Sequence, residues 1–384
     1  MKIRVPGYFK EFKCIASECE DTCCAGWQIV IDNETYKKYE KIKGTFGERL
    51  RNEIVQQDGE NTFVLKGNNC SFLNEGKTCD IYAELGEDSL CYTCRQYPRY
   101  MEEFGNLREI GISLSCPEAA RLILRDHKKA EFELSETEEE ITSYNDINPM
   151  VFINLLQCRK IVFDILQNPH INLEDRVSLA LKFADEIQER IDDDNIQGIK
   201  EVREKYSDND FINEAINSLD KYKAKGKVKY RNLQELFKVF KELKHINQND
   251  PLHLDELLMC FGHSDADEEA YFDKHNQFNK YYEDKLYKFE NLLVYFVYRY
   301  FMKAVFDHDV AAKVKTAAVS YLMIEELFVL SWMKKGEFTD EDAVDVMHTY
   351  SKDIEHLEEN IETLAKVFKT NDVFKLEEIL KILF

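Results

Sequence analysis

The sequence has few of the residues that break or tightly bend a chain. It holds 14 Gly and 6 Pro among 384 residues, about 5% together, where about 12% is usual. This shortage argues against a fold with many tight turns and favours long helices. No run of 18 or more apolar residues occurs, so we expect no membrane span. The first residues, MKIRVPGYFKEF, lack the apolar core of a secretory signal, so we expect a cytoplasmic protein.

Positive charge is also scarce. The chain has 51 Lys and Arg against 73 Asp and Glu, a formal net charge of −22. Binding to nucleic acid or to anionic lipid needs clustered positive charge, so we expect neither partner. Residues 1–126 carry 17 basic and 21 acidic side chains, and residues 127–384 carry 34 and 52, giving −4 and −18. The acidic second part suits a basic protein partner.

Two familiar cofactor motifs are missing. The sequence contains no GxGxxG and no GxG, so it lacks the glycine-rich turn of a Rossmann-type nucleotide site. A Cys-x3-Cys-x2-Cys triplet is absent too, because Gly26 stands where its third cysteine would follow Cys19 and Cys23. A bound nucleotide cofactor would therefore need a different kind of site.

Cysteine, by contrast, is abundant in one region. Nine of the eleven cysteines precede residue 117, and no histidine occurs before His127. In a reducing compartment such density indicates metal or redox chemistry more than disulfides. A site here would be all-thiolate, which suits structural zinc or an iron–sulfur cluster. The nine are Cys14, Cys19, Cys23, Cys24, Cys70, Cys79, Cys91, Cys94 and Cys116.

Three further observations bear on which cysteines could bind a metal. Cys158 and Cys260 lie on apolar helical stripes, so we interpret both as core residues. Cys91-x2-Cys94 could be a redox pair, but no βαβ pattern surrounds it. Adjacent cysteines on a helix diverge by about 100°, so Cys23 and Cys24 would not easily bind the same tetrahedral ion. The sequence leaves open which four thiolates share a site and whether there are one or two sites.

The pattern predicts a mainly α protein: a small α+β cysteine-rich domain, residues 1–130, docked on an α-helical domain, residues 145–384. The acidic stretch from Glu133 to Glu140 is interpreted as a solvated connector or a fraying helix end. Asn148 with Pro149 predicts a helix start, and Thr339 with Asp342 predicts a capping box. Other predicted elements are strands at 27–32 and 62–65, a hairpin completed by 105–115, and helices at 283–306 and 310–335.

Aromatic residues are dense between Tyr271 and Phe306, with thirteen Tyr or Phe in 36 residues. At helical spacing such a stripe is usually core. The alternative is that part of it lines a channel for a substrate side chain.

The cysteine region resembles the flagellin lysine N-methylases. The similar stretches are CIASECEDTCCAGW from Cys14, CSFLNEGKTCDIYAELGEDSLCYTCRQYPR from Cys70 and LSCPEAAR from Leu114, with a weaker likeness in ENLLVYFVYRYF from Glu290. Part of this pattern is shared with a broader class of zinc- or iron-chelating cysteine-cluster proteins. The family pattern includes all the clustered cysteines except Cys91, so the resemblance implies the metal ligands Cys14, Cys19, Cys23, Cys24, Cys70, Cys79, Cys94 and Cys116.

What the resemblance implies is transfer of a methyl group from S-adenosylmethionine to lysines of flagellin, with a [4Fe–4S] iron–sulfur cluster favoured over zinc. Arg99 and Glu118 sit beside clustered cysteines, where Arg99 could grip the cofactor carboxylate and both could act in catalysis. The alternative for both residues is a structural salt bridge. The alternative function is a non-catalytic, metal-chelating or structural zinc module whose helical half binds a protein.

Overall fold

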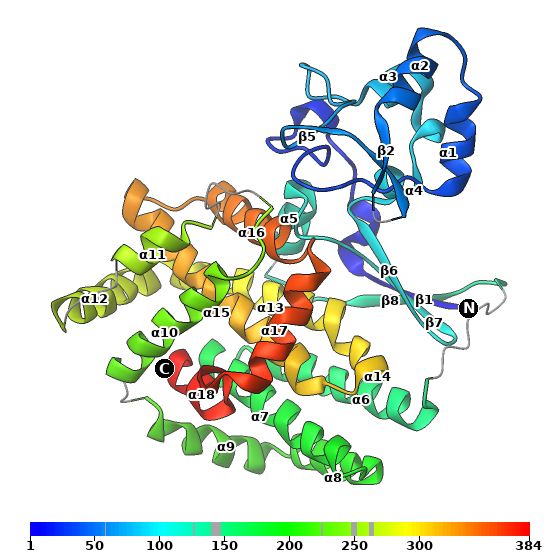
Figure 1. Ribbon diagram of the computed structural model, residues 1–384. Helices are drawn as coiled ribbons and strands as arrows, with labels where there is room; N and C mark the ends of the chain where they lie inside the picture. The colour runs from blue at the N-terminus through cyan, green and yellow to red at the C-terminus, as the bar shows by residue number, and fades with distance from the viewer. Residues whose placement is uncertain (58, 126, 140–146, 224–225, 247–251, 261–264) are drawn as a thin grey trace.

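The computed structural model describes residues 1–57, 59–125, 127–139, 147–223, 226–246, 252–260 and 265–384. It confirms a mainly α fold with small sheets confined to the N-terminal part (Figure 1). The strands are β1 Lys2–Pro6, β2 Ile54–Gln57, β3 Glu60–Phe63, β4 Leu65–Lys66, β5 Asn69–Cys70, β6 Arg99–Phe104, β7 Leu107–Ile112 and β8 Phe132–Glu136.

One four-stranded sheet, in the order β6-β7-β1-β8, connects the two parts of the molecule. Strands β6 and β7 form the predicted hairpin, with Gly105 at φ +62° in its turn. Strand β1 runs parallel to β7 and antiparallel to β8, so the chain start lies inside the sheet. Gly111 is needed here, because a Cβ at that position would stand 2.3 Å from the Tyr100 hydroxyl.

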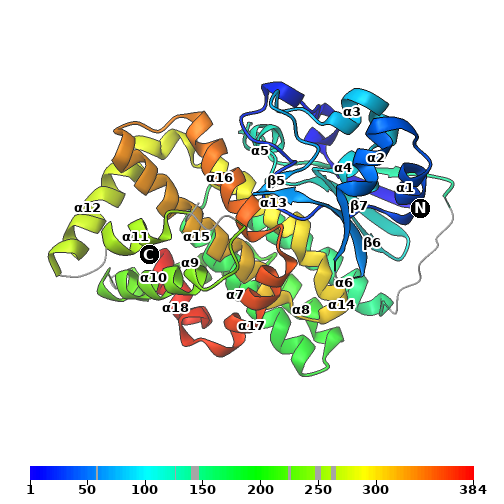
Figure 2. The same cartoon turned by 45° about the horizontal axis from the view of Figure 1, so that its top comes forward.

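Between β1 and β6 the chain builds a separate lobe, residues 13–98, which we call the cysteine lobe. Figures 1 and 2 show it beside the helices, with β5 and α5 (Pro117–Leu124) near the junction. Its own hydrophobic core includes Ile29, Ile31, Phe63 and Phe72. Its helices are α1 Asn33–Glu40, α2 Gly44–Asn52, α3 Asp80–Leu85 and α4 Tyr92–Gln96.

The rest of the chain is a helical assembly around α15, which packs against α7, α12, α13, α16 and α17. Its apolar core continues into the sheet and α5. The core therefore includes residues from both predicted domains, 1–130 and 145–384, and the division into these two domains stays a prediction. The helices are α6 Pro149–Leu166, α7 Leu173–Asp192, α8 Ile199–Lys205, α9 Asn209–Asn217, α10 Gly226–Lys241, α11 Leu254–Cys260, α12 Asp265–Tyr282, α13 Tyr287–Tyr300, α14 Ala304–Asp307, α15 Val310–Lys335, α16 Asp340–Ile354, α17 Glu358–Thr370 and α18 Leu376–Leu383.

Helix α15 has the length and mean hydropathy of a membrane-spanning helix. Within the fold, 78% of its most apolar window is buried by the surrounding helices. This is the pattern of a central core helix, whose apolar faces are all covered by protein.

Several local predictions are confirmed. Asn148 caps α6, with its Oδ1 accepting from the Met150 amide at 2.9 Å, and Pro149 is the first helical residue. Thr339 and Asp342 form the reciprocal capping box of α16. The 310–335 helix has the predicted bounds.

Three predictions are wrong. Residues 27–32 form no strand: they meet the free edge of β3 in one isolated bridge, from Val30 to Thr62, and this pairing is too short to make a strand. The acidic stretch is not a connector as far as residue 136, because β8 pairs with β1. In this strand Glu133 Oε2 lies 2.5 Å from Lys10 Nζ. Glu140 lies outside the described residues. Residues 283–306 do not form one continuous α-helix. A 3₁₀ turn at Glu283–Lys285 precedes α13, and a second one at Phe301–Lys303 separates α13 from α14.

A buried ion pair holds the sheet on the helices. Arg159 of α6 is 1% exposed and Glu109 of β7 is 3% exposed, and Arg159 Nη1 donates to Glu109 Oε2 at 2.7 Å. Arg4 of β1, which is opposite Glu109 in the strand register, donates to Oε1 at 2.9 Å. One carboxylate therefore fixes two strands and a helix relative to one another.

We predict that Glu109→Ala lowers the free energy of unfolding by about 3–5 kcal/mol, because it leaves the buried Arg159 without its counter-charge. Urea denaturation measures this loss. The matched control is Lys160→Ala, which breaks the exposed Lys160–Asp164 pair on the same helix and should cost no more than about 1 kcal/mol. Equal effects of the two variants would contradict the prediction.

Candidate functional site

The clustered cysteines fall into two groups at the junction of the cysteine lobe with the helices. In what we call the inner cysteine group, Cys24 makes thiol hydrogen bonds with Cys23 and Cys79, Cys91 bonds with Cys94, and Cys70 is near. In the outer cysteine group, Cys14 and Cys19 lie close enough to Cys116 to affect its ionisation. The ten cysteines within the described side chains are all free thiols.

Three of these cysteines stand at helix starts. Cys79, Cys91 and Cys116 are the N-cap residues of α3, α4 and α5. Amide N–H groups at a helix start stabilise a thiolate. The hydrogen bond from Cys24 and the amides of Ile81 and Tyr82 lower the pKa of Cys79 to about 6. Burial raises the pKa of Cys116 to about 12, although the amides of Glu118 and Ala119 oppose the rise.

The inner cysteine group fits a soft metal by the chemistry of its donors. It offers only sulfur ligands, and amide groups face Cys79 and Cys91. Iron–sulfur clusters and structural zinc use such donor sets. Within the described part of the chain, no three His, Cys, Asp or Glu side chains stand in coordinating geometry. The ligand assignment therefore stays a prediction. Cys91, which the family pattern leaves out, interacts with Cys94.

The turn after Cys23 and Cys24 requires a glycine. Gly26 has φ +89°, and a Cβ there would stand 2.9 Å from a methyl carbon of Ile246 and 3.5 Å from the Lys352 chain. The turn at Cys23–Gly26 thus packs directly against the helical part. Lys352 of α16 adds polar contacts, with its Nζ 2.6 Å from Asp21 Oδ2 and 3.2 Å from the Thr22 carbonyl.

Three rings meet where the inner cysteine group faces the helices. His356 stacks on Trp27 with the ring centres 5.2 Å apart, and Tyr97 lies 5.7 Å from His356. The Trp27 indole donates to the Cys23 carbonyl at 2.9 Å. Burial, with the nearby charges of Arg299 and Lys352, lowers the pKa of His356 to about 4. Its Nε2 is buried without a hydrogen-bond partner, and the lowered pKa keeps the ring neutral at pH 7.

Beside these rings lies a buried network, which we call the Glu355 network. Glu355 accepts from the hydroxyls of Tyr300 at 2.8 Å and Tyr295 at 3.1 Å, and the Arg299 Nε is 3.2 Å away. Arg299 also donates to Ser113 Oγ at 2.9 Å. From Ser113, hydroxyl contacts continue to Ser115 at 2.8 Å and then to Tyr97 at 3.2 Å.

The Glu355 network therefore joins helices α13 and α16 to the turn before Cys116. The amide of Leu114 donates to the Tyr295 hydroxyl at 3.2 Å, which fixes the same turn from its backbone. A shift of α13 would move the outer cysteine group with it.

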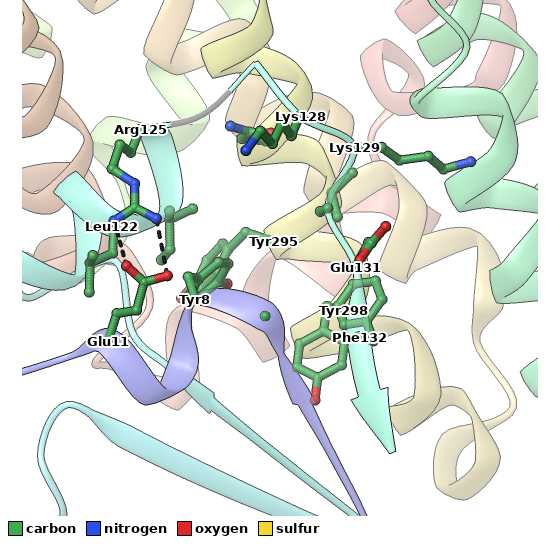
Figure 3. Close-up of a pocket in the computed structure, with 15 residues that line it drawn as sticks. Tyr8, Glu11, Leu122, Arg125, Lys128, Lys129, Glu131, Phe132, Tyr295 and Tyr298 are labelled. Carbon is green, nitrogen blue, oxygen red and sulfur yellow. Dashed lines mark hydrogen bonds and ion pairs between the residues drawn. The ribbon is translucent and has the colours of Figure 1, made fainter.

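On its other side, Tyr295 lines a cavity of about 240 Å³. Figure 3 shows Tyr8, Tyr295, Tyr298 and Phe132 around this space, with Arg125 and Lys128 above them. The aromatic stripe predicted between Tyr271 and Phe306 is thus core for most of its length, while two of its tyrosines reach a cavity.

The two predicted polar site residues have local partners. The Arg99 guanidinium is exposed and lies 5.1 Å from the centre of the Phe12 ring. Glu118 accepts from Arg121 Nη1 at 3.3 Å, and Arg121 also reaches Glu341 of α16 at 2.6 Å and Glu20 of the cysteine lobe. These contacts give both residues structural partners, and their proposed catalytic roles stay predictions.

The comparisons with known proteins agree with one another. Residues 159–382 match the family described as FliB lysine N-methylase C-terminal domain. The chain belongs to the lysine N-methylase family. A lysine-N-methylase of Salmonella typhimurium is 32% identical over 128 residues, and the flagellar biosynthetic protein FliU of Salmonella muenchen is 33% identical over 135 residues.

The extent of these matches differs. The aligned part is 32% of this chain and of the Salmonella typhimurium protein, so the chain matches about a third of that relative's length. It covers 76% of FliU. No solved structure matches this chain. The lysine N-methylase match contains α13 and α16, and with them Tyr295, Arg299, Tyr300 and Glu355 of the Glu355 network.

Sequence reasoning missed three residues of this site: Arg299, Glu355 and His356. Cys158 was correctly predicted as core and is fully buried, and the side chain of Cys260 lies outside the described part. One signal could have revealed Arg299, since it is the single charge within the apolar and aromatic run LLVYFVYRYF. A cationic side chain in such a run needs a buried partner.

We predict that the His356 ring stays neutral at pH 5, as an NMR titration of its imidazole can measure. Because its pKa in the folded protein, about 4, lies below the unfolded value of 6.5, the unfolded chain binds the extra proton between these values. Stability therefore falls as pH drops through that window, by about 2–3 kcal/mol from this group. His356→Phe should flatten the pH dependence by that amount, and an unchanged slope would contradict the prediction.

Proposed function

We propose that this protein transfers a methyl group from S-adenosylmethionine to lysines of flagellin. The observation that carries the proposal is the match of its helical part to the lysine N-methylase C-terminal domain. The names of the relatives, a lysine-N-methylase and a flagellar biosynthetic protein, support lysine methylation as the reaction and flagellin as the substrate. The strong negative charge of residues 127–384 suits a lysine-bearing partner.

The junction offers groups that this reaction needs. A lysine amine attacks a methyl group only when neutral, so a nearby base or water path must take its proton. His356, whose pKa is lowered to about 4, stays neutral and adds no charge that would repel a lysine ammonium. Trp27 and Tyr97 supply aromatic faces beside it, which favour the methylene chain and the charge of an incoming lysine.

A metal group fits the inner cysteine group, and a [4Fe–4S] cluster is the proposed occupant. Cys23, Cys24, Cys79 and Cys94 are its proposed ligands, with Cys70 and Cys91 adjacent. Such a cluster would supply redox chemistry, because four thiolates occupy all four of its iron positions. The chain itself orients the group through the helix starts at Cys79 and Cys91 and through the Gly26 turn against α16.

The direct test of the proposed function is anaerobic incubation of the purified protein with S-adenosylmethionine and flagellin. Mass spectrometry of the flagellin should show lysines heavier by one or more methyl groups. A second reaction that omits the donor is the control. Flagellin that stays unmodified with metal-loaded protein would overturn the proposed function and favour a metal-holding module without catalysis.

We predict that anaerobically purified protein contains stoichiometric iron or zinc and that Cys→Ser at Cys23, Cys24, Cys79 or Cys94 depletes it. Each substitution removes a soft thiolate from the inner cysteine group. Metal analysis measures the loss, and a brown colour bleached by dithionite distinguishes iron–sulfur from zinc. Cys158→Ser is the matched control, because that buried cysteine lies in the helical core. Normally folded, metal-free wild-type protein would contradict the prediction.

We further predict that flagellin binding weakens about tenfold or more as salt rises from about 0.05 to 0.5 M, because salt screens charge over about 8 Å at physiological strength and over less at higher strength. Fluorescence anisotropy with labelled flagellin measures the affinity. A thermal melt at each salt concentration checks that the enzyme stays folded. An affinity independent of salt would exclude electrostatic recruitment.

A further inference from the structure

The 240 Å³ cavity is an open-sided pocket lined by residues of both parts of the molecule. Its walls come from the 3₁₀ turn after β1, the end of α5, the segment leading into β8, and α13. Phe132 of β8 stacks on Tyr298 of α13 with the ring centres 4.7 Å apart, so the aromatic wall spans the sheet and the helix. Tyr8 and Tyr295 complete the wall (Figure 3).

Aromatic faces attract a positive centre that has left water, and a sulfonium is such a centre. Burial raises the pKa of Tyr8 and of Tyr295, so both hydroxyls remain protonated and the rings stay neutral. The wall therefore carries no fixed charge of its own.

The mouth of the cavity carries three cations, Arg125, Lys128 and Lys129, and two carboxylates, Glu11 and Glu131. Arg125 pairs with Glu11 through two contacts of 2.7 and 3.1 Å, and Lys129 turns away to Asp164 at 3.2 Å. Lys128 has no ion-pair partner among the described residues, and Figure 3 shows it above the tyrosines. A carboxylate at the mouth would meet Lys128, with Arg125 beside it.

We propose that this cavity binds the amino-acid end of the S-adenosyl methyl donor, with its carboxylate at Lys128 and its sulfonium against the tyrosine rings. The proposal rests on the proposed function. The cavity volume is below the roughly 300–1,000 Å³ of pockets that enclose whole drug-sized ligands. It suits the methionine end, and the nucleoside extends through the mouth.

A methyl group transfers only when the attacking amine stands about 3–3.5 Å from it, so a donor held here requires the lysine amine to reach the cavity side of Tyr295. Tyr295 forms part of the cavity wall, and its hydroxyl belongs to the Glu355 network, which reaches the turn before Cys116. This position differs from the alternative in which an open metal position and Arg99 hold the donor. Arg99 lies on Phe12 and not at the cavity.

Calorimetry on the metal-loaded full chain tests the proposal with three ligands: S-adenosylmethionine, S-adenosylhomocysteine and 5′-methylthioadenosine. Lys128→Ala should weaken S-adenosylhomocysteine about tenfold, since it removes a charged carboxylate contact. The same variant should leave 5′-methylthioadenosine unchanged, because that ligand has no carboxylate. Lys160→Ala, an exposed lysine of α6 outside the cavity, is the matched control and should bind all three ligands like wild type.

Tyr8→Leu provides a second, independent arm. Loss of its ring should weaken S-adenosylmethionine more than S-adenosylhomocysteine, because only the former carries the sulfonium charge. Thermal melts confirm that each variant is folded before binding is measured.

The outcomes separate this proposal from the proposed function. Wild-type protein that methylates flagellin, with Lys128→Ala and Tyr8→Leu binding all ligands normally, would overturn the cavity assignment alone. Donor binding that is lost in Cys23→Ser but kept in Lys128→Ala would place the donor at the cysteines. Wild-type protein that neither binds the donor nor methylates would overturn both.

Discussion

The buried carboxylate of Glu355 is the constraint on which the junction depends. Its side chain has no exposed surface, and it holds Arg299, Tyr295 and Tyr300 in one network. A buried charge is tolerated only when it is paired and fully hydrogen-bonded. The positions of α13 and α16 are therefore coupled, and through Ser113 so is the turn that carries Cys116.

This coupling explains how a small lobe with its own core can take part in a site built with helices. The lobe's core and the helical core are separate clusters of apolar residues. What fixes the lobe is specific contact at its cysteine turns: Gly26 against Ile246, Lys352 on Asp21, and His356 stacked on Trp27. Sequence segments more than 200 residues apart thus meet at the inner cysteine group.

The sequence allowed the local elements to be predicted where the signal is local. Caps at Asn148 and Thr339 depend on side chains within three residues of the helix start, and both were predictable. The 27–32 segment and the acidic stretch failed because strand formation depends on pairing with distant residues: β1 recruits residues 132–136, whereas residues 29–31 pair with β3 through a single bridge. The site divides in the same way. Cysteine spacing indicated a metal group, but Glu355 and His356 acquire meaning only once α16 lies on the cysteine lobe.

The central claim is that the cysteine lobe and the helical part act as one methyl-transfer site through the Glu355 network. The most direct test is the rate of flagellin methylation by Glu355→Gln, measured at saturating donor on folded protein with wild-type metal content. The account predicts that kcat falls at least about tenfold, because Arg299 loses its buried counter-charge and the Cys116 turn shifts. Glu358→Gln, an exposed change two residues beyond His356, should keep the wild-type rate. A folded, metal-loaded Glu355→Gln protein that methylates flagellin as fast as wild type would contradict the account.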